Sequence, residues 1–156
     1  MAVIVCDTRE QKSGHVDAYF DSVGVQHVRS KLIVGDYARL DNQTVAVDRK
    51  QHLQECCGNV CQQHERFRAE CALAQSLGIR LVILIEHSAA VKTLDDVRTW
   101  VNPRLKTSPK AVTGARLAAI METMADKYGV EWRFCRKQDT GRVVCEILGV
   151  EVERKP

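Results

Sequence analysis

The chain has 156 residues, of which 45% are hydrophobic and 28% are charged, and its formal net charge is +3. This length suits one domain of ordinary size, and this balance excludes a disordered tail or a collagen-like repeat. So small a net charge does not by itself indicate a nucleic-acid-binding protein, and any such function must depend on where the charges lie.

No segment has the pattern of a membrane span or a secretion signal. The longest apolar run, residues 81–85, is far shorter than the roughly 20 residues that cross a bilayer, and the apolar start, residues 2–6, ends at Asp7. The seven cysteines are odd in number, and several lie among helix-patterned apolar residues, which favours free thiols in a reducing compartment. We therefore expect no membrane association, and a cytoplasmic location in a prokaryote or virus-infected cell, or a nuclear one in a eukaryote.

The first part of the chain predicts a strand, a short helix, a second strand and then a hairpin, from β-branched runs, apolar periodicity and turn residues. In chain order these are residues 2–6, 16–23, 25–28 and the hairpin of 37–40 with 44–47. Gly24 is expected to end the helix. In the hairpin, Asp36 opens one strand and Asp48 closes the other.

The second part predicts helices that alternate with strands. Residues 51–77 have a helical pattern that is interrupted near Gly58, with an apolar stripe in its later half at Phe67, Cys71, Ala74 and Leu77. The elements expected after it are a strand at 81–85, a helical turn at 95–100, a loop at 101–112, a helix at 115–128, a strand at 130–134 and a helix to residue 148, capped by Asp139 or Thr140. This alternation predicts a three-layer α/β fold in a single domain over residues 1–156.

Two acidic residues and a lysine form the most informative pattern. Asp36 follows Gly35, and Asp48 comes twelve residues later with Lys50 two residues beyond it. The expected hairpin brings both carboxylates to one end, and the alternation of a strand puts Asp48 and Lys50 on one face. Mg²⁺ prefers carboxylate oxygens, and it can activate water and polarise a phosphate, while a lysine can orient water, accept its proton or stabilise charge. Alone the pattern is weak, and Asp36 could be a simple turn residue.

The surrounding residues strengthen the pattern, because together they resemble the nuclease domain of the XPF family of structure-specific endonucleases. Residues 7–10 (DTRE) match the D-x-R-E loop of that family, residues 35–37 (GDY) its first acidic motif, and residues 48–50 (DRK) its E-R-K core. Residues 65–68 and 81–86 are similar to its later helix and core strand. The resemblance extends over nearly the whole chain.

The resemblance implies a three-layer α/β/α, restriction-endonuclease-like fold with a mixed central sheet. It also implies a Mg²⁺- or Mn²⁺-dependent endonuclease that cuts branched or flap DNA in repair or recombination and forms a homodimer through its last helices. The apolar face of residues 117–128 is compatible with such a dimer or with internal core. The implied site residues are the metal ligands Asp36 and Asp48, the catalytic Lys50, and the supporting Asp7, Arg9, Glu10 and Arg49.

Three features depart from the family pattern. Asp48 stands where the family has glutamate, and Gln54 stands where it has an acid, with Glu55 one residue late. No tandem helix-hairpin-helix module is recognised, so we expect DNA affinity to come from the nuclease domain itself or from a protein partner. The missing acid leaves a second hypothesis open, that of a non-catalytic DNA-binding or scaffold subunit. A nuclease of the same fold that cuts plain duplex or RNA is a third.

Basic residues provide candidate DNA contacts. Arg9 and Arg49 could bind phosphates through their guanidinium groups or form ion pairs with acids inside the site. The other candidates are Arg66 and Arg68 on the predicted helix, and Lys106 and Lys110 in a loop that could follow a DNA backbone or be merely solvated.

Cys57, Cys61 and His64 share one helix face at zinc-ligand spacing, but no second ligand pair accompanies them. Half-buried structural side chains are therefore the main alternative to a zinc site.

Overall fold

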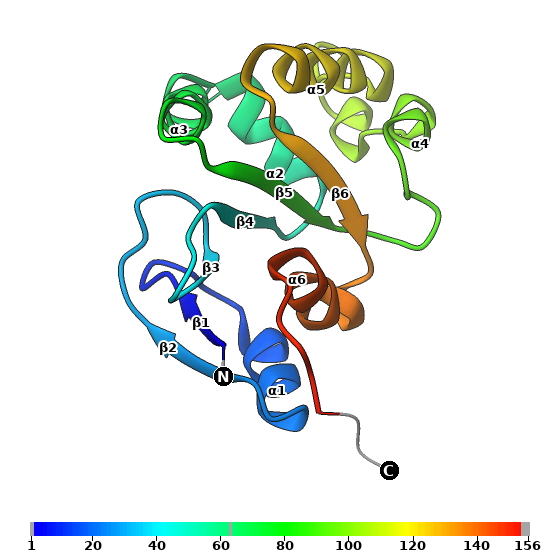
Figure 1. Ribbon diagram of the computed structural model, residues 1–156. Coiled ribbons are helices and arrows are strands. Elements are labelled where there is room, and N and C mark those ends of the chain that lie inside the picture. The colour runs from blue at the N-terminus through cyan, green and yellow to red at the C-terminus, as the bar shows by residue number, and fades with distance from the viewer. Residues whose placement is uncertain (1, 63, 154–156) are drawn as a thin grey trace.

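The computed structural model describes residues 2–62 and 64–153 and centres on a mixed six-stranded sheet (Figure 1). The strands are β1 (Val3–Cys6), β2 (Gln26–Arg29), β3 (Tyr37–Arg39), β4 (Val45–Lys50), β5 (Arg80–Glu86) and β6 (Glu131–Cys135). Their order is β2-β1-β3-β4-β5-β6. Strand β3 is antiparallel to β1 and to β4, and the β1–β2, β4–β5 and β5–β6 pairs are parallel.

Helices cover both faces of this sheet. They are α1 (Gly14–Ser22), α2 (Leu53–Cys57), α3 (His64–Ser76), α4 (Leu94–Thr99), α5 (Gly114–Tyr128) and α6 (Thr140–Leu148), with a π-helical turn at Gly58–Gln62. Figure 1 shows α2, α3, α4 and α5 on one side and α1 and α6 on the other. The expected three-layer α/β/α fold with a mixed sheet is therefore confirmed.

Strand β5 shows why the sheet is buried on both sides. Leu81, Ile83 and Ile85 pack into the core under α2, α3 and α5. Val82 and Leu84 pack into the second core under α1 and α6. A strand covered on both faces must be apolar at every position, which explains the continuous run in the sequence.

The interruption predicted near Gly58 is confirmed, because the π-helical turn at Gly58–Gln62 separates α2 from α3. Two other details of the predicted elements are corrected. Leu77 lies outside the core, since 51% of it is exposed. The Asp139 side chain does not cap α6 and instead accepts a hydrogen bond from Arg136, while Thr140 donates to Glu86.

The apolar face of α5 belongs to the interior. Leu117 and Met121 are fully buried in the core against the sheet, and Met124 is 4% exposed. Of the two interpretations of residues 117–128, internal core is therefore the correct one. A dimer cannot use this face without unfolding it from the sheet.

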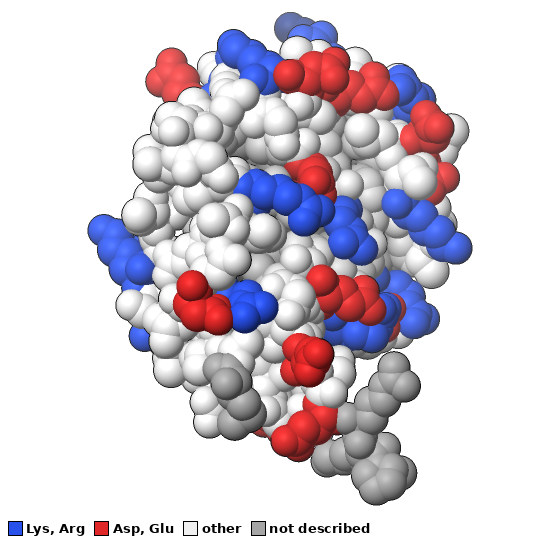
Figure 2. Space-filling view, viewed as in Figure 1, with Lys and Arg blue, Asp and Glu red and all other residues white. Residues whose placement is uncertain are grey.

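The outer surface of the described residues has no large region of one charge on the face shown in Figure 2. Within the described residues, no helix combines the length and the apolarity that a membrane crossing needs. On the face shown in Figure 2, lysine and arginine side chains are interspersed with aspartate and glutamate. This mixture agrees with the small net charge of the chain.

Candidate active site

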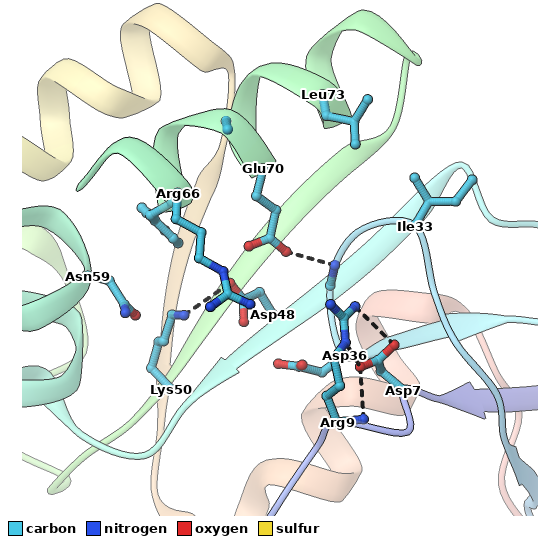
Figure 3. Close-up of a pocket in the computed structure, with 13 residues that line it drawn as sticks. Asp7, Arg9, Ile33, Asp36, Asp48, Lys50, Asn59, Arg66, Glu70 and Leu73 are labelled. Atoms are coloured by element: carbon cyan, nitrogen blue, oxygen red, sulfur yellow. Dashed lines mark hydrogen bonds and ion pairs between the residues drawn. The ribbon is translucent and has the colours of Figure 1, made fainter. Parts of the chain in front are cut away.

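A pocket of about 410 Å³ lies between α3, the end of β4 and the loop before β3 (Figure 3). It brings together residues that are far apart in the sequence. Its polar lining residues are Asp7, Arg9, Asp36, Asp48, Lys50, Asn59, Arg66 and Glu70. Of the residues predicted for the site, Glu10, Arg49, Arg68, Lys106 and Lys110 do not line it.

The backbone before β3 places Asp36 beside β4. Gly35 has a φ of 76°, and a Cβ atom there would lie 3.0 Å from the carbonyl oxygen of Val47, so glycine is needed for this close approach. Asp36 donates its backbone N–H to the same carbonyl oxygen at 2.7 Å. Its Oδ2 accepts the backbone N–H of Arg49 at 2.8 Å. The Asp36 carboxylate is therefore held against β4, as the hairpin prediction required.

Strand alternation puts Asp48 and Lys50 on the α3 side of the sheet. Both are buried, at 5% and 8% exposed, and β4 runs on to Lys50 rather than closing at Asp48. Lys50 Nζ lies 3.2 Å from Asp48 Oδ2 and 5.0 Å from the centre of the Phe67 ring. Burial acts to lower the pKa of Lys50, but the carboxylates of Asp48 and Asp36 outweigh burial and hold the pKa above its ordinary value.

The two aspartates oppose each other electrostatically. Burial raises the pKa of Asp36 well above its usual value, and the nearby charges of Asp48 and Glu10 raise it further. Asp48 Oδ2, although paired in charge with Lys50, makes no hydrogen bond with the described residues. Two neighbouring carboxylates, one with a buried oxygen that makes no hydrogen bond, are suitable ligands for a divalent cation that prefers oxygen.

Asp36→Asn is expected to stabilise the metal-free protein at neutral pH. The folded-state pKa of Asp36 is raised, so its stabilising contribution is present at low pH and is lost as the pH rises through that pKa. Asparagine can still accept the Arg49 N–H but carries no charge. We expect a melting temperature in EDTA roughly 2–4 °C higher at pH 7, the shift that about 1 kcal/mol produces at this domain size. The difference should vanish near pH 3, and an equal or lower melting temperature at pH 7 contradicts the prediction.

Arg49 lies on the opposite face of β4, with only 1% of its side chain exposed. Its guanidinium donates to both carboxylate oxygens of Glu10 at 3.1 Å and to Glu86 Oε1 at 2.6 Å. Glu86 also accepts from Thr140 and pairs with His15. The structure therefore shows Arg49 in an ion pair, and it holds Glu10 there too rather than in the pocket.

Asp7 and Arg9 form the wall of the pocket nearest β1. Asp7 Oδ2 accepts Arg9 Nε at 2.9 Å, and Asp7 Oδ1 accepts the backbone N–H of Leu32 at 2.8 Å. Burial acts to raise the pKa of Asp7, but these hydrogen bonds outweigh it and lower the pKa. The Arg9 side chain is 58% exposed, so it can reach a ligand while it stays paired with Asp7.

Helix α3 contributes residues that the sequence prediction only partly identified. Arg66 points into the pocket between Lys50 and Glu70 (Figure 3), whereas Arg68 does not line it. Glu70, one turn after Arg66, accepts the backbone N–H of Gly35 at 2.9 Å. Glu70 was missed, although its spacing from Arg66 on one helix face was visible in the sequence. Asn59, in the π-helical turn, was also missed, and no sequence signal marked it.

Gln54 and Glu55 lie at a second pocket of about 660 Å³ on the other side of α2. Glu55 Oε2 accepts the backbone N–H of Gln51 there, at 2.7 Å. Lys110 also lines this second pocket, together with Arg104 from the same loop, whereas Lys106 does not. The position expected to hold the outer acid thus does not line the pocket of Asp36 and Asp48.

The zinc hypothesis is not supported by the geometry. Cys57 and Cys61 line the second pocket, but with His64 they do not bring three ligand atoms within 4.8 Å of one another. Among the described residues, that separation is met by a different set, Cys6, Asp17 and His27.

Comparison with known proteins identifies the family and the fold of this chain. The family model of the ERCC4 domain matches residues 6–147. The fold is similar to XPF from Aeropyrum pernix, with a TM-score of 0.68 and 19% identity over 94% of this chain and 63% of that one. The same protein in a complex with DNA matches equally, over 96% of this chain and 64% of that one. This chain thus spans less than two thirds of those solved chains. The comparison with curated proteins finds no match. The chain belongs to the ERCC4 domain family, and it has the fold of an XPF-type nuclease domain.

Proposed function

We propose that the chain is a metal-dependent DNA endonuclease whose ion-binding ligands are Asp36 and Asp48. One observation carries this proposal: two crowded carboxylates and a buried lysine share one pocket, and Asp48 Oδ2 in that pocket is paired in charge with Lys50 but makes no hydrogen bond with the described residues. Mg²⁺ or Mn²⁺ held by these carboxylates would supply the charge that polarises a phosphate and activates water. Retention of both acids and the lysine favours a nuclease over a non-catalytic scaffold.

The residues around the aspartates have distinct roles. Lys50 is held by Asp48 and Phe67 with a raised pKa, which favours a cation that stabilises negative charge on the phosphate over a general base. Arg66 enters the pocket from α3 and can bind a phosphate oxygen. Asp7 orients Arg9, whose exposed guanidinium gives a second phosphate contact at the other wall.

The rim of the pocket supports branched DNA as the substrate. Ile33, in the loop before β3, is 67% exposed, and Leu73, on α3, is 42% exposed; both line the pocket (Figure 3). Apolar side chains gain nothing from phosphates, but they can pack against bases that have left the stack. Such bases occur at flaps, forks and junctions, and not in a continuous duplex.

The test is cleavage of labelled flap, fork, four-way-junction and plain duplex DNA by the purified chain in Mg²⁺, Mn²⁺ or EDTA. We expect cutting of the branched substrates that depends on the metal. Binding of the same substrates without cutting in either metal would favour the scaffold hypothesis. Equal cutting of plain duplex would contradict the branched preference, and a parallel RNA series tests the third hypothesis.

Arg66→Ala is expected to weaken DNA binding far more than Arg68→Ala. The two arginines lie on the same helix, but Arg66 alone of the pair lines the pocket. Loss of a desolvated, charge-assisted contact costs about 2 kcal/mol, or roughly thirtyfold in Kd. Fluorescence anisotropy in Ca²⁺, at one stated salt concentration, measures both variants. Equal losses would mean that α3 contacts DNA through its outer surface instead.

We further propose a role in DNA repair or recombination, in the cytoplasm of a prokaryote or infected cell or in a eukaryotic nucleus. We also propose a homodimer, which the family resemblance implies, and a protein partner that adds DNA affinity. Because the apolar faces of α5 and α6 both pack inside the fold, a dimer would have to use another surface. Sedimentation equilibrium with and without DNA distinguishes a monomer from a dimer.

A further inference from the structure

The acid that the family pattern places at position 54 is missing, and another acid enters the pocket. Gln54 is exposed and lies against the second pocket, across α2 from Asp36 and Asp48. Glu70 comes from α3 instead, and its carboxylate faces the catalytic pocket (Figure 3). A third carboxylate of this region therefore comes from α3 and not from α2.

We propose that Glu70 is the outer acid of the divalent-ion site, standing in for the acid absent at Gln54. The inference rests on the proposed nuclease function, because it assumes an ion between Asp36 and Asp48. Glu70 adds negative charge and an acceptor oxygen beside those two aspartates. It is a positioning residue, and not itself one of the groups that react.

The hydrogen bonds of Glu70 suit this role. Its Oε1 accepts the backbone N–H of Gly35 at 2.9 Å, which ties α3 to the residue immediately before Asp36. This contact fixes the carboxylate in place and leaves Oε2 available to the pocket. The Glu70 carboxylate would therefore lie near a bound ion without any rearrangement of α3.

Two further buried oxygens belong to residues of this pocket, and one of them lies beside the charge of Lys50. Three buried side-chain polar atoms make no hydrogen bond within the described chain, and two of them, Asp48 Oδ2 and Asn59 Oδ1, belong to residues that line this pocket. Asp48 is 5% exposed, so this oxygen cannot be satisfied by bulk solvent. Asn59 is carried by the π-helical turn, a feature that often marks functional sites. Buried oxygens that make no hydrogen bond, in a pocket lined by carboxylates, suit a hard cation and its ligands.

The spacing assigns Glu70 to the outer shell. In the described structure, oxygens of Asp36, Asp48 and Glu70 do not all approach within 4.8 Å of one another. An ion held by the two aspartates would therefore meet Glu70 indirectly. Outer partners of this kind typically contribute 10- to 100-fold to metal affinity.

The test is Mn²⁺ binding to the DNA-free chain, measured from the electron paramagnetic resonance signal of free Mn²⁺. Glu70→Gln keeps an oxygen that can accept the Gly35 N–H and removes only the charge. Glu65→Gln removes the same charge from an exposed position of the same helix and serves as the matched control. We expect Glu70→Gln to raise the Kd for Mn²⁺ about tenfold or more, with a melting temperature in EDTA that is not lowered, and Glu65→Gln to leave the Kd unchanged.

An Asp48→Asn variant separates this inference from the proposed function. If Asp48→Asn loses Mn²⁺ while Glu70→Gln binds within about threefold of wild type, the inference fails and the nuclease site stands. If Asp48→Asn binds as wild type does, the ion site itself is wrong, and the inference fails with it. Weaker binding by Glu70→Gln together with a lower melting temperature in EDTA would assign Glu70 a structural role instead.

Discussion

Asp48→Asn is expected to slow metal-dependent cleavage of branched DNA about a thousandfold. Asparagine keeps the size of the side chain but removes the charge that holds the ion, and it leaves Lys50 without its nearest counter-charge. The stabilisation that a metal ion gives to a transition state is several kcal/mol, and each 1.36 kcal/mol is about tenfold in rate. Single-turnover cleavage of a labelled flap in saturating Mg²⁺ measures the effect.

Asp126→Asn is the matched control for this experiment, because Asp126 is exposed on α5 away from the pocket. It should cut at the wild-type rate. Lys50→Ala should also lower the cleavage rate by about a hundredfold or more, since a cation placed at developing negative charge contributes that much. Cutting by Asp48→Asn within tenfold of wild type would mean that the catalytic site lies elsewhere.

Arg49→Met is expected to destabilise the protein by about 3–5 kcal/mol, the usual cost of removing one partner from a buried ion pair. The guanidinium is the cation between Glu10 and Glu86, and its side chain is 1% exposed. Without it, two buried carboxylates face each other across the end of the sheet. Urea unfolding followed by circular dichroism measures the loss.

Arg133→Met provides the comparison, because Arg133 is an exposed arginine in the neighbouring part of the sheet. It should change the free energy of unfolding by no more than about 0.5 kcal/mol. If Arg49→Met kept its stability but lost DNA affinity, Arg49 would be a phosphate contact after all. A structural role for Arg49 thus predicts a loss of stability in Arg49→Met, whereas a phosphate contact predicts a loss of DNA affinity with the stability kept.

Much of the fold was predictable, because local patterns determine where its elements lie. The continuous apolar run of residues 81–85 requires a strand covered on both faces, and β5 is buried there at every position. The hairpin likewise brought Asp36 next to β4, as the turn residues indicated. The apolar stripe of α3 was right at Phe67 and wrong at Leu77, because helix ends project past the core.

The placement of Arg49 could have been derived from the same alternation that paired Asp48 with Lys50. In a strand, the residue between two neighbours on one face must lie on the other face. The family motif groups Asp48, Arg49 and Lys50, which are consecutive. Strand alternation places Arg49, the middle residue, on the opposite face from the other two. Its partner Glu86 ends another strand, so their pairing was not visible in the sequence.

The sequence alone determined the alternation of strands and helices, the hairpin, and the grouping of Asp36, Asp48 and Lys50, because each follows from a pattern within a short stretch of chain. Only the tertiary structure decided that Glu70 and Asn59 enter the pocket, that Gln54 does not line it, and that Arg49 is buried with Glu10 and Glu86. These depend on how α2, the π-helical turn and α3 pack across the sheet. That packing is set by many long-range contacts at once, and no local pattern encodes it.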